Sequence, residues 1–475
     1  MALRVAILSA EVSPWAQTGG LGNVVGALPK ALRRASADTA SVGVFLPFYR
    51  SVRDVAHKLG RRIEITGLET RLQLGAAPVH SRLLRWVDPS GTQHLFVDAP
   101  VLYDRPGGIY SHADNAARFA YFCRAALDFA PHVLGGIPHI VHGHDWTTGG
   151  LPLLTAGKAK VVLTIHNLAH QGWFAQHEMA MFGVLHMPEE YRSGEAISFL
   201  RGGLKLADAV TTVSPNYARE IQTPDHGLGL EGILRERGVH GILNGIDTDE
   251  WNPETDAALP ARFSSADLSG KAVCKRALQR ELGLVESDDL LVGVVSRLDP
   301  QKGLDLLADV ADALPGLGMQ LAVLGSGDPS LAGRYAALAR RHGGRVALRF
   351  DYDVGLAHRI VAGSDATVMP SRFEPCGLTQ MYAMRYGTVP IVHPVGGLDD
   401  TVQDPGDDAL LRGEGTGIRF YPLQQSTLLI GLKRMALLRQ RDPELSAIRR
   451  TIMTRDWSWT TSARKYLGLF HELAA

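Results

Sequence analysis

Residues 365–390 read DATVMPSRFEPCGLTQMYAMRYGTVP and combine a short apolar run, a polar loop and a helical segment. The loop carries Arg372 and Glu374, and a helix that begins near Gly377 would leave backbone N–H groups beside the Glu374 carboxylate. A carboxylate that accepts from hydroxyls, next to amides that donate to oxygens, suits a polyhydroxylated, phosphate-bearing ligand such as a nucleotide sugar. An ordinary strand–loop–helix joint with an N-terminal carboxylate explains these residues equally well, so the rest of the chain must discriminate.

The second half of the chain repeats the same alternation of strand and helix. Repeated βα units predict a doubly wound parallel sheet, so the fold class is α/β. The predicted elements are strand Leu290–Val295, helix Leu304–Leu314, strand Gln320–Leu324, helix Ser330–Arg341, strand Arg345–Phe350, helix Val354–Gly363, strand Ala366–Met369, helix Gly377–Tyr386, strand Val389–Val392 and helix Leu398–Val402.

The first half has its own strand and glycine loop, in residues 3–25, LRVAILSAEVSPWAQTGGLGNVV. A strand, a glycine loop and a helix can seat a phosphate, although GGxG is a weaker signal than GxGxxG, which leaves a dehydrogenase as a minor alternative. Strands His139–His142 and Val161–Ile165 both end in polar clusters, as strands do at the ligand-binding edge of a parallel sheet. Apolar runs at Val42–Leu46, Thr70–Leu74, Ser81–Val87 and His94–Val97 predict an additional antiparallel or mixed section.

The length of 475 residues suits two domains of about 200 residues or more. A turn-rich segment that begins at Leu243 marks the expected linker. We therefore predict an N-terminal domain of residues 1–243 and a C-terminal domain of residues 244–455. Residues 456–475 form a C-terminal helix, which either belongs to the second domain or returns to the first.

Composition excludes several classes of function. Lys plus Arg and Asp plus Glu both number 49, so no net field attracts nucleic acid or an anionic membrane. Three widely spaced cysteines without a CxxC pair argue against disulfides and a structural zinc site, and favour the reducing cytoplasm. The N-terminus lacks a leader and no apolar run is long enough to span a membrane, so we expect a soluble protein.

A set of long motifs extends over nearly the whole chain: SAEVSPWAQTGGLGNVVGALPKAL, LYDRPG, HGHDW, HNLAHQG, SPNYAREI, LNGID, SRLDPQKGLDL, LGSGDP, SRFEPCGLTQ, VGGLDDTV and DWSW. In these motifs the chain resembles bacterial glycogen synthases and plant starch synthases, which are retaining glucosyltransferases. The resemblance implies the GT-B fold, two Rossmann-like domains that face a deep cleft. It also implies ADP-glucose as donor substrate, an α-1,4-glucan as acceptor, and no metal or other cofactor.

For the C-terminal domain the resemblance implies a donor site. Arg297 and Lys302 would neutralise the leaving diphosphate, which two cations between a strand and a helix can do. Glu374 would accept hydrogen bonds from the glucose hydroxyls, and an aromatic residue, Tyr352, would stack on adenine. The backbone amides around Cys376 would donate hydrogen bonds to the sugar. The Cys376 thiol is not expected to act as a nucleophile, because no local base activates it. The remaining donor-site candidates are Gly377, Leu378 and Thr379.

For the N-terminal domain the resemblance implies the groups opposite the donor. His166 would approach the transferred glucose, Asp145 would bind sugar or acceptor hydroxyls, and Asn244 would lie beside the cleft. The glycine loop, with Gly19 and Gly20, would hold phosphate through its amides. Because no carboxylate nucleophile is evident, a front-side route through an oxocarbenium-like state is favoured over double displacement.

The glycine loop departs from the family pattern KTGGLxD. Gln17 stands where a lysine is usual, Asn23 where an aspartate is usual, and His170 where a tyrosine is frequent. A cation is thereby lost near the reacting centre, which would cost roughly 2–4 kcal/mol of transition-state stabilisation in the family geometry. Three explanations remain open: a slower ADP-glucose glucan synthase, an enzyme with another donor or a small acceptor, or a glucan-binding relative with little activity.

Overall fold

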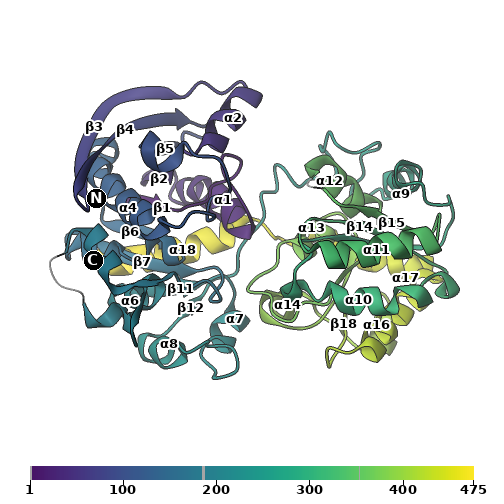
Figure 1. Ribbon diagram of the computed structural model, residues 1–475. Helices are drawn as coiled ribbons and strands as arrows, with labels where there is room; N and C mark the ends of the chain where they lie inside the picture. Colours follow the sequence, from purple (N-terminus) through teal and green to yellow (C-terminus); the bar gives the residue numbers. More distant parts are fainter. Residues whose placement is uncertain (1–2, 185–187, 352) are drawn as a thin grey trace. The chain divides into compact units, whose positions relative to one another are not determined.

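The computed structural model describes residues 3–184, 188–351 and 353–475, which fold into two compact units. The N-terminal unit contains the chain up to Gly245 together with Trp459–Ala475, and the C-terminal unit contains Ile246–Ser458. The chain thus passes between units within two residues of the expected linker start, Leu243. Helix α18 (Trp459–Ala474), drawn in yellow in Figure 1, belongs to the N-terminal unit and packs against α1 (Gly20–Ala35).

The core of the N-terminal unit is a nine-stranded sheet with the order β12-β11-β7-β6-β1-β2-β5-β4-β3. Strands from β12 to β5 run parallel, whereas β4 pairs antiparallel with both β5 and β3. The predicted additional section is therefore the long β3–β4 hairpin at one edge of this sheet (Figure 1). The strands are β1 (Arg4–Leu8), β2 (Ser41–Pro47), β3 (Glu64–Leu74), β4 (Ala77–Val87), β5 (Gln93–Asp98), β6 (Ile140–His144), β7 (Lys160–Ile165), β11 (Ala209–Thr212) and β12 (His240–Gly241).

Helices cover this sheet because their apolar residues form one buried stripe. In α4 (Asn115–Leu134) the buried side chains include Phe119, Phe122 and Phe129, at the spacing of a helix face. Ser214 caps α7 (Pro215–Glu220), its hydroxyl accepting from the Tyr217 N–H. The other elements of this unit are α2 (Arg50–Lys58), α3 (Pro100–Tyr103), α5 (Leu151–Thr155), α6 (Phe199–Leu206), α8 (Glu231–Arg237) and a small sheet of β8 (Trp173–Ala175), β10 (Ala196–Ser198) and β9 (Arg192–Ser193).

The C-terminal unit is built on a six-stranded, wholly parallel sheet with the order β15-β14-β13-β16-β17-β18. The order reverses at β13, which is where a doubly wound sheet opens a ligand site at its carboxyl edge. The strands are β13 (Leu290–Val295), β14 (Met319–Leu324), β15 (Val346–Arg349), β16 (Ala366–Met369), β17 (Val389–Val392) and β18 (Ile418–Arg419). The helices are α9 (Ser269–Leu282), α10 (Leu304–Val310), α11 (Pro329–Arg341), α12 (Val354–Gly363), α13 (Thr379–Arg385), α14 (Gly396–Thr401), α15 (Asp407–Leu410), α16 (Gln425–Arg439) and α17 (Asp442–Thr454).

Three of the predicted helices of this unit differ from their expected bounds by two residues or more. Helix α10 ends at Val310 and continues only as 3₁₀ turns, and α14 begins at Gly396 instead of Leu398. Helix α13 begins at Thr379, two residues later than expected. The reason is local: Gly377 has a φ of +69°, and the Gln380 side chain donates to the carbonyl oxygens of Cys376 and Gly377, which turns the chain before the helix starts.

Candidate active site

In the C-terminal unit, Lys302 and Glu374 form an ion pair between the loops that follow β13 and β16. The distance from Lys302 Nζ to Glu374 Oε2 is 2.6 Å, and the Ser371 hydroxyl donates to the same oxygen at 3.0 Å. The Glu374 side chain is only 6% exposed. Two of the predicted site residues, a cation and a carboxylate, are therefore brought into direct contact at the carboxyl edge of the parallel sheet.

Arg297 lies on the same loop but is held differently. Its guanidinium pairs with Asp299 at 3.1 Å, and half of its side-chain surface remains exposed. Asp299 in turn caps the short turn that leads to Lys302, accepting from the Lys302 N–H at 3.2 Å. Arg297 thus presents an accessible cation five residues before Lys302, whose side chain is 19% exposed.

Arg372 joins the two loops. Its guanidinium makes two hydrogen bonds to the Asp305 carboxylate, at 2.8 and 2.6 Å, and a third to the Pro300 carbonyl oxygen at 2.7 Å. The Arg372 N–H also donates to the Gln301 carbonyl oxygen at 2.8 Å. At Gly303, with a φ of +62°, a Cβ would clash with the Pro370 carbonyl oxygen, so only glycine permits the two loops to approach this closely.

The residues after Glu374 form the loop that leads into α13. Cys376 is buried, and the Gly397 N–H donates to the Glu374 carbonyl oxygen at 3.1 Å, which ties this loop to α14. Leu378 precedes α13 and Thr379 opens it. Tyr352, the candidate for adenine stacking, lies outside the described residues.

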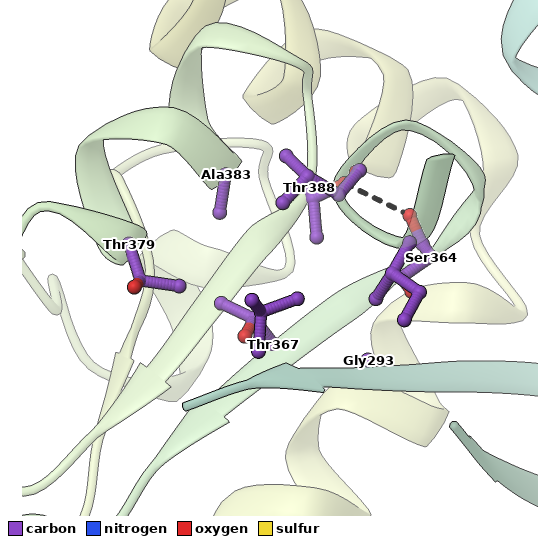
Figure 2. A pocket seen from close by; sticks show the side chains of 9 residues that line it. Gly293, Ser364, Thr367, Thr379, Ala383 and Thr388 are labelled. Carbon is purple, nitrogen blue, oxygen red and sulfur yellow. Dashed lines mark hydrogen bonds between the residues drawn. The ribbon is translucent and has the colours of Figure 1, made fainter. Parts of the chain in front are cut away.

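Behind α13 lies a small cavity of about 10 Å³ in the core of the unit. Figure 2 shows its lining by Thr379 and Ala383 of the helix and by Thr367, Ser364 and Thr388 from the strands and the turns beside them. The Thr388 hydroxyl donates to the Ser364 carbonyl oxygen at 2.9 Å, the dashed line in Figure 2. A nucleotide needs a pocket of roughly 300 Å³ or more, so this cavity is a packing feature and not the donor site.

In the N-terminal unit, Asp145 and His166 meet at the carboxyl ends of β6 and β7. One oxygen of Asp145 accepts from the His166 N–H at 2.7 Å and from the Asn167 N–H at 3.4 Å. Asp145 has a φ of +57°, a conformation that costs free energy outside glycine and is typical of constrained sites. Asp145 therefore positions the backbone at His166. The sequence did not predict this contact, since the expected role of Asp145 was to bind sugar or acceptor hydroxyls.

Burial dominates the electrostatics of this site. Burial raises the pKa of the Asp145 carboxyl to about 7, although the two backbone N–H donors oppose the change. Burial lowers the pKa of His166 to about 3, so its imidazole is neutral at physiological pH. His144 lies against it, with its Nδ1 at 2.9 Å from His166 Nε2 and a pKa likewise far below the usual value through burial.

The glycine loop is organised by Glu11, a residue that sequence reasoning missed. The Glu11 carboxylate accepts from the Thr18 and Gly19 N–H groups at 2.5 and 3.1 Å, and from the Tyr110 hydroxyl at 2.6 Å. A carboxylate of the protein thus occupies these two amides in this structure, and the expectation that the loop amides hold phosphate stays a prediction. The only signal of Glu11 in the sequence is an acid three residues beyond the end of a buried strand.

The remaining candidates of the N-terminal unit lie in the segments that follow β1 and β12. Gln17 is half-buried, and a Cβ at Gly22 would press against its side chain, so the loop folds tightly around it. Gly19 caps α1 and Gly20 begins it. Asn244 follows β12 and is buried, and its side-chain oxygen has no hydrogen-bond partner among the described residues.

The described residues contain neither a cluster suited to a metal ion nor a helix suited to a membrane span. Within residues 3–184, 188–351 and 353–475, no group of three or more His, Cys, Asp or Glu side chains is arranged to hold a metal ion. No helix in the described part of the chain has the length and apolar character that crossing a membrane requires.

Two α/β units built largely on parallel strands match the starch synthase IV structure and define a glycosyltransferase of the GT-B class. Residues 4–236 match the family model of the starch synthase catalytic domain, and residues 275–414 match that of glycosyl transferases group 1. The chain belongs to the glycogen and starch synthase family.

Individual relatives cover the whole chain. Glycogen synthase from Anaeromyxobacter sp. (strain Fw109-5) is 44% identical over 496 residues, and glycogen synthase from Acidiphilium cryptum (strain JF-5) is 43% identical over 496 residues, each covering 100% of both chains. Among solved structures, the catalytic domain of starch synthase IV from Arabidopsis thaliana, bound to ADP and acarbose, superimposes with a TM-score of 0.90 at 32% identity and 100% coverage of both chains.

Proposed function

We infer that this protein is a glycogen synthase, a glucosyltransferase that moves glucose from ADP-glucose to the non-reducing end of an α-1,4-glucan. One observation carries the inference: similarity at 44% identity covers the full length of a glycogen synthase. The starch synthase IV catalytic domain, similar over its whole length, was solved with ADP and acarbose, which supports a nucleotide and a glucan as the two ligands.

We propose that the C-terminal unit handles the donor. Without a ligand, Lys302 and Glu374 neutralise each other at 2.6 Å. A bound diphosphate would compete for the Lys302 ammonium, and Arg297, half exposed, would add a second cation as negative charge develops on the leaving group. Glu374, freed from part of its attraction to Lys302, would accept hydrogen bonds from the glucose hydroxyls, assisted by the backbone from Cys376 to Thr379.

We further propose that the N-terminal unit supplies neutral hydrogen-bonding groups to the same reaction. His166, uncharged, would donate to a sugar hydroxyl without adding positive charge beside an oxocarbenium-like carbon. The leaving phosphate oxygen would take the proton of the acceptor 4-hydroxyl as the new bond forms on the same face, which retains the configuration of the anomeric carbon. No protein carboxylate is needed as a nucleophile in this route, in contrast with retaining glycosidases.

A panel of donors and acceptors tests the function. Purified protein is incubated with ADP-glucose, UDP-glucose or GDP-mannose and with glycogen, maltooligosaccharides or a small non-glucan alcohol, and products are read by mass. We expect ADP release and growth of the glucans by one hexose at a time from ADP-glucose. Transfer only from another nucleotide sugar, or only to the small acceptor, would contradict the proposed function.

A further inference from the structure

The N-terminal unit contains a buried contact between two histidine rings. His144 is fully buried and His166 is 8% exposed, and the two rings meet through His144 Nδ1 and His166 Nε2 at 2.9 Å. One nitrogen must donate and the other accept, because both rings are neutral and each carries one N–H. Which ring donates decides whether Nδ1 of His166, the nitrogen outside this contact, offers a substrate an N–H donor or a bare acceptor.

The surroundings of His144 determine the direction of this bond. Its second nitrogen, Nε2, is buried and has no hydrogen-bond partner in the described part of the chain. If His166 donated, the proton of His144 would lie on that Nε2 as an orphaned, buried N–H, which is rare in proteins and costly. If His144 donates through Nδ1–H, Nε2 is only a bare acceptor, the less unfavourable of the two arrangements.

The neighbouring ring does not supply the missing partner. His142 lies beside His144 with ring centroids 4.3 Å apart and ring planes tilted by 40°, and its Nε2 has another partner. His142 Nε2 is instead 2.6 Å from the Thr164 hydroxyl, which is itself 2.6 Å from the Thr211 hydroxyl. The His144–His166 contact is therefore the one polar contact that the His144 ring makes among the described residues.

We propose that His144 is a positioning residue that fixes His166 as the tautomer protonated on Nδ1. This inference rests on the proposed function and names the group that His166 presents: a single N–H donor for a sugar hydroxyl. Asp145 restrains the backbone N–H of His166 at 2.7 Å, and His144 restrains its ring. The two restraints are separate, so the ring can be released while the backbone stays in place.

Nitrogen-15 NMR of histidine-labelled resting protein tests the tautomer directly, because protonated and bare ring nitrogens have well-separated shifts. The His166 signals are assigned by their loss in His166→Asn. We expect Nδ1 protonated and Nε2 bare in the wild type. A wild-type His166 protonated on Nε2 would overturn the inference, whether or not the protein transfers glucose.

Variants at residue 144 test the consequence for catalysis. His144→Leu removes the donor, so we expect a mixture of His166 tautomers and a fall in kcat of about tenfold, with a smaller change in the KM for ADP-glucose. His144→Asn retains an amide donor near the position of Nδ1 and should restore both the single tautomer and most of the kcat. Equal kcat and equal tautomer mixtures in the two variants would contradict the proposal.

His142→Leu is the matched control, since it damages the same buried cluster without touching the bond to His166. It should lower the melting temperature and leave the His166 tautomer as in the wild type. If His142→Leu gives the same mixture of His166 tautomers as His144→Leu, general loosening of the cluster explains the mixture and the proposal fails. Loss of transfer in the donor panel with an intact Nδ1 tautomer would overturn the proposed function alone.

Discussion

The two units hold their candidate site residues by opposite means. In the C-terminal unit the holding contacts are charged: Lys302 with Glu374 and Arg372 with Asp305. In the N-terminal unit the contacts around His166 are between neutral rings and from backbone N–H groups to Asp145, whose pKa is raised to about 7. The difference supports the proposed division of chemistry, with anion binding on one unit and neutral hydrogen bonding to a sugar on the other.

The largest effect is expected from removing the charge on the C-terminal side. Glu374→Gln keeps the size of the side chain but leaves Lys302 without its carboxylate and the sugar without a charged acceptor. We expect kcat in the glucan assay to fall by about 10²–10³-fold. The matched control is Glu281→Gln, which breaks the Glu281–Arg359 pair on the surface of the same unit and should leave activity unchanged. Near-normal activity of Glu374→Gln would remove Glu374 from the site.

A cation added to the glycine loop of the N-terminal unit tests whether the neutral character of that unit limits turnover. Gln17→Lys with Asn23→Asp restores the charges expected in the family, and the Cβ of residue 17, which packs beside Gly22, is retained. We expect kcat on ADP-glucose to rise by about tenfold, because a cation returns near the leaving group.

The single variant Asn23→Asp serves as the control for this pair and should not raise kcat. Steady-state turnover with glycogen as acceptor measures both. Unchanged or lower turnover of the double variant would mean that the neutral loop is adapted to this protein's own donor geometry.

The smallest effect concerns stability against pH. Burial lowers the folded-state pKa of His142 and His166 to about 3, so the unfolded chain binds their protons first as pH falls below about 6.5. Each histidine should therefore destabilise the fold by about 1.4 kcal/mol per pH unit below that point. Asp145 acts in the opposite sense: its raised pKa gives stability that is present below about pH 4 and is lost as pH rises to about 7.

Urea unfolding between about pH 6.5 and pH 5 measures this slope. His142→Leu removes one of the titrating groups and should flatten the dependence by about 1.4 kcal/mol per pH unit. His132→Leu, on the surface turn of α4, leaves the buried cluster intact and should retain the wild-type slope. A slope unaffected by His142→Leu would mean that this ring takes up its proton as readily in the folded protein as in the unfolded chain.

Much of the fold was predictable because the strands are short, apolar and regularly spaced. The alternation from Leu290 onward predicted a parallel sheet, and six parallel strands are found. The helix limits were less predictable, since α13 begins at Thr379 only through the positive φ of Gly377 and the side-chain bonds of Gln380. Such hydrogen bonds depend on the conformation of a single side chain, which the periodicity of apolar residues does not predict.

The candidate residues were predictable where they follow strands. Asp145 and His166 directly follow strands, Lys302 and Glu374 lie in loops that follow strands, and the structure brings the four together in two pairs. Glu11 and His144 were not predicted as site residues. Their importance comes from contacts across the sheet edge, with loop amides in one case and with the ring of His166 in the other.

By itself, the sequence determined the α/β class, the two-domain organisation and the family, because strand periodicity and long motifs are local properties of the chain. The tertiary structure alone decided which partner each polar side chain has. The Glu11 carboxylate occupies loop amides that the sequence had assigned to phosphate, and α18 packs in the N-terminal unit although it closes the chain. These outcomes depend on which strand ends lie side by side, and burial there sets both the hydrogen-bond partners and the pKa values.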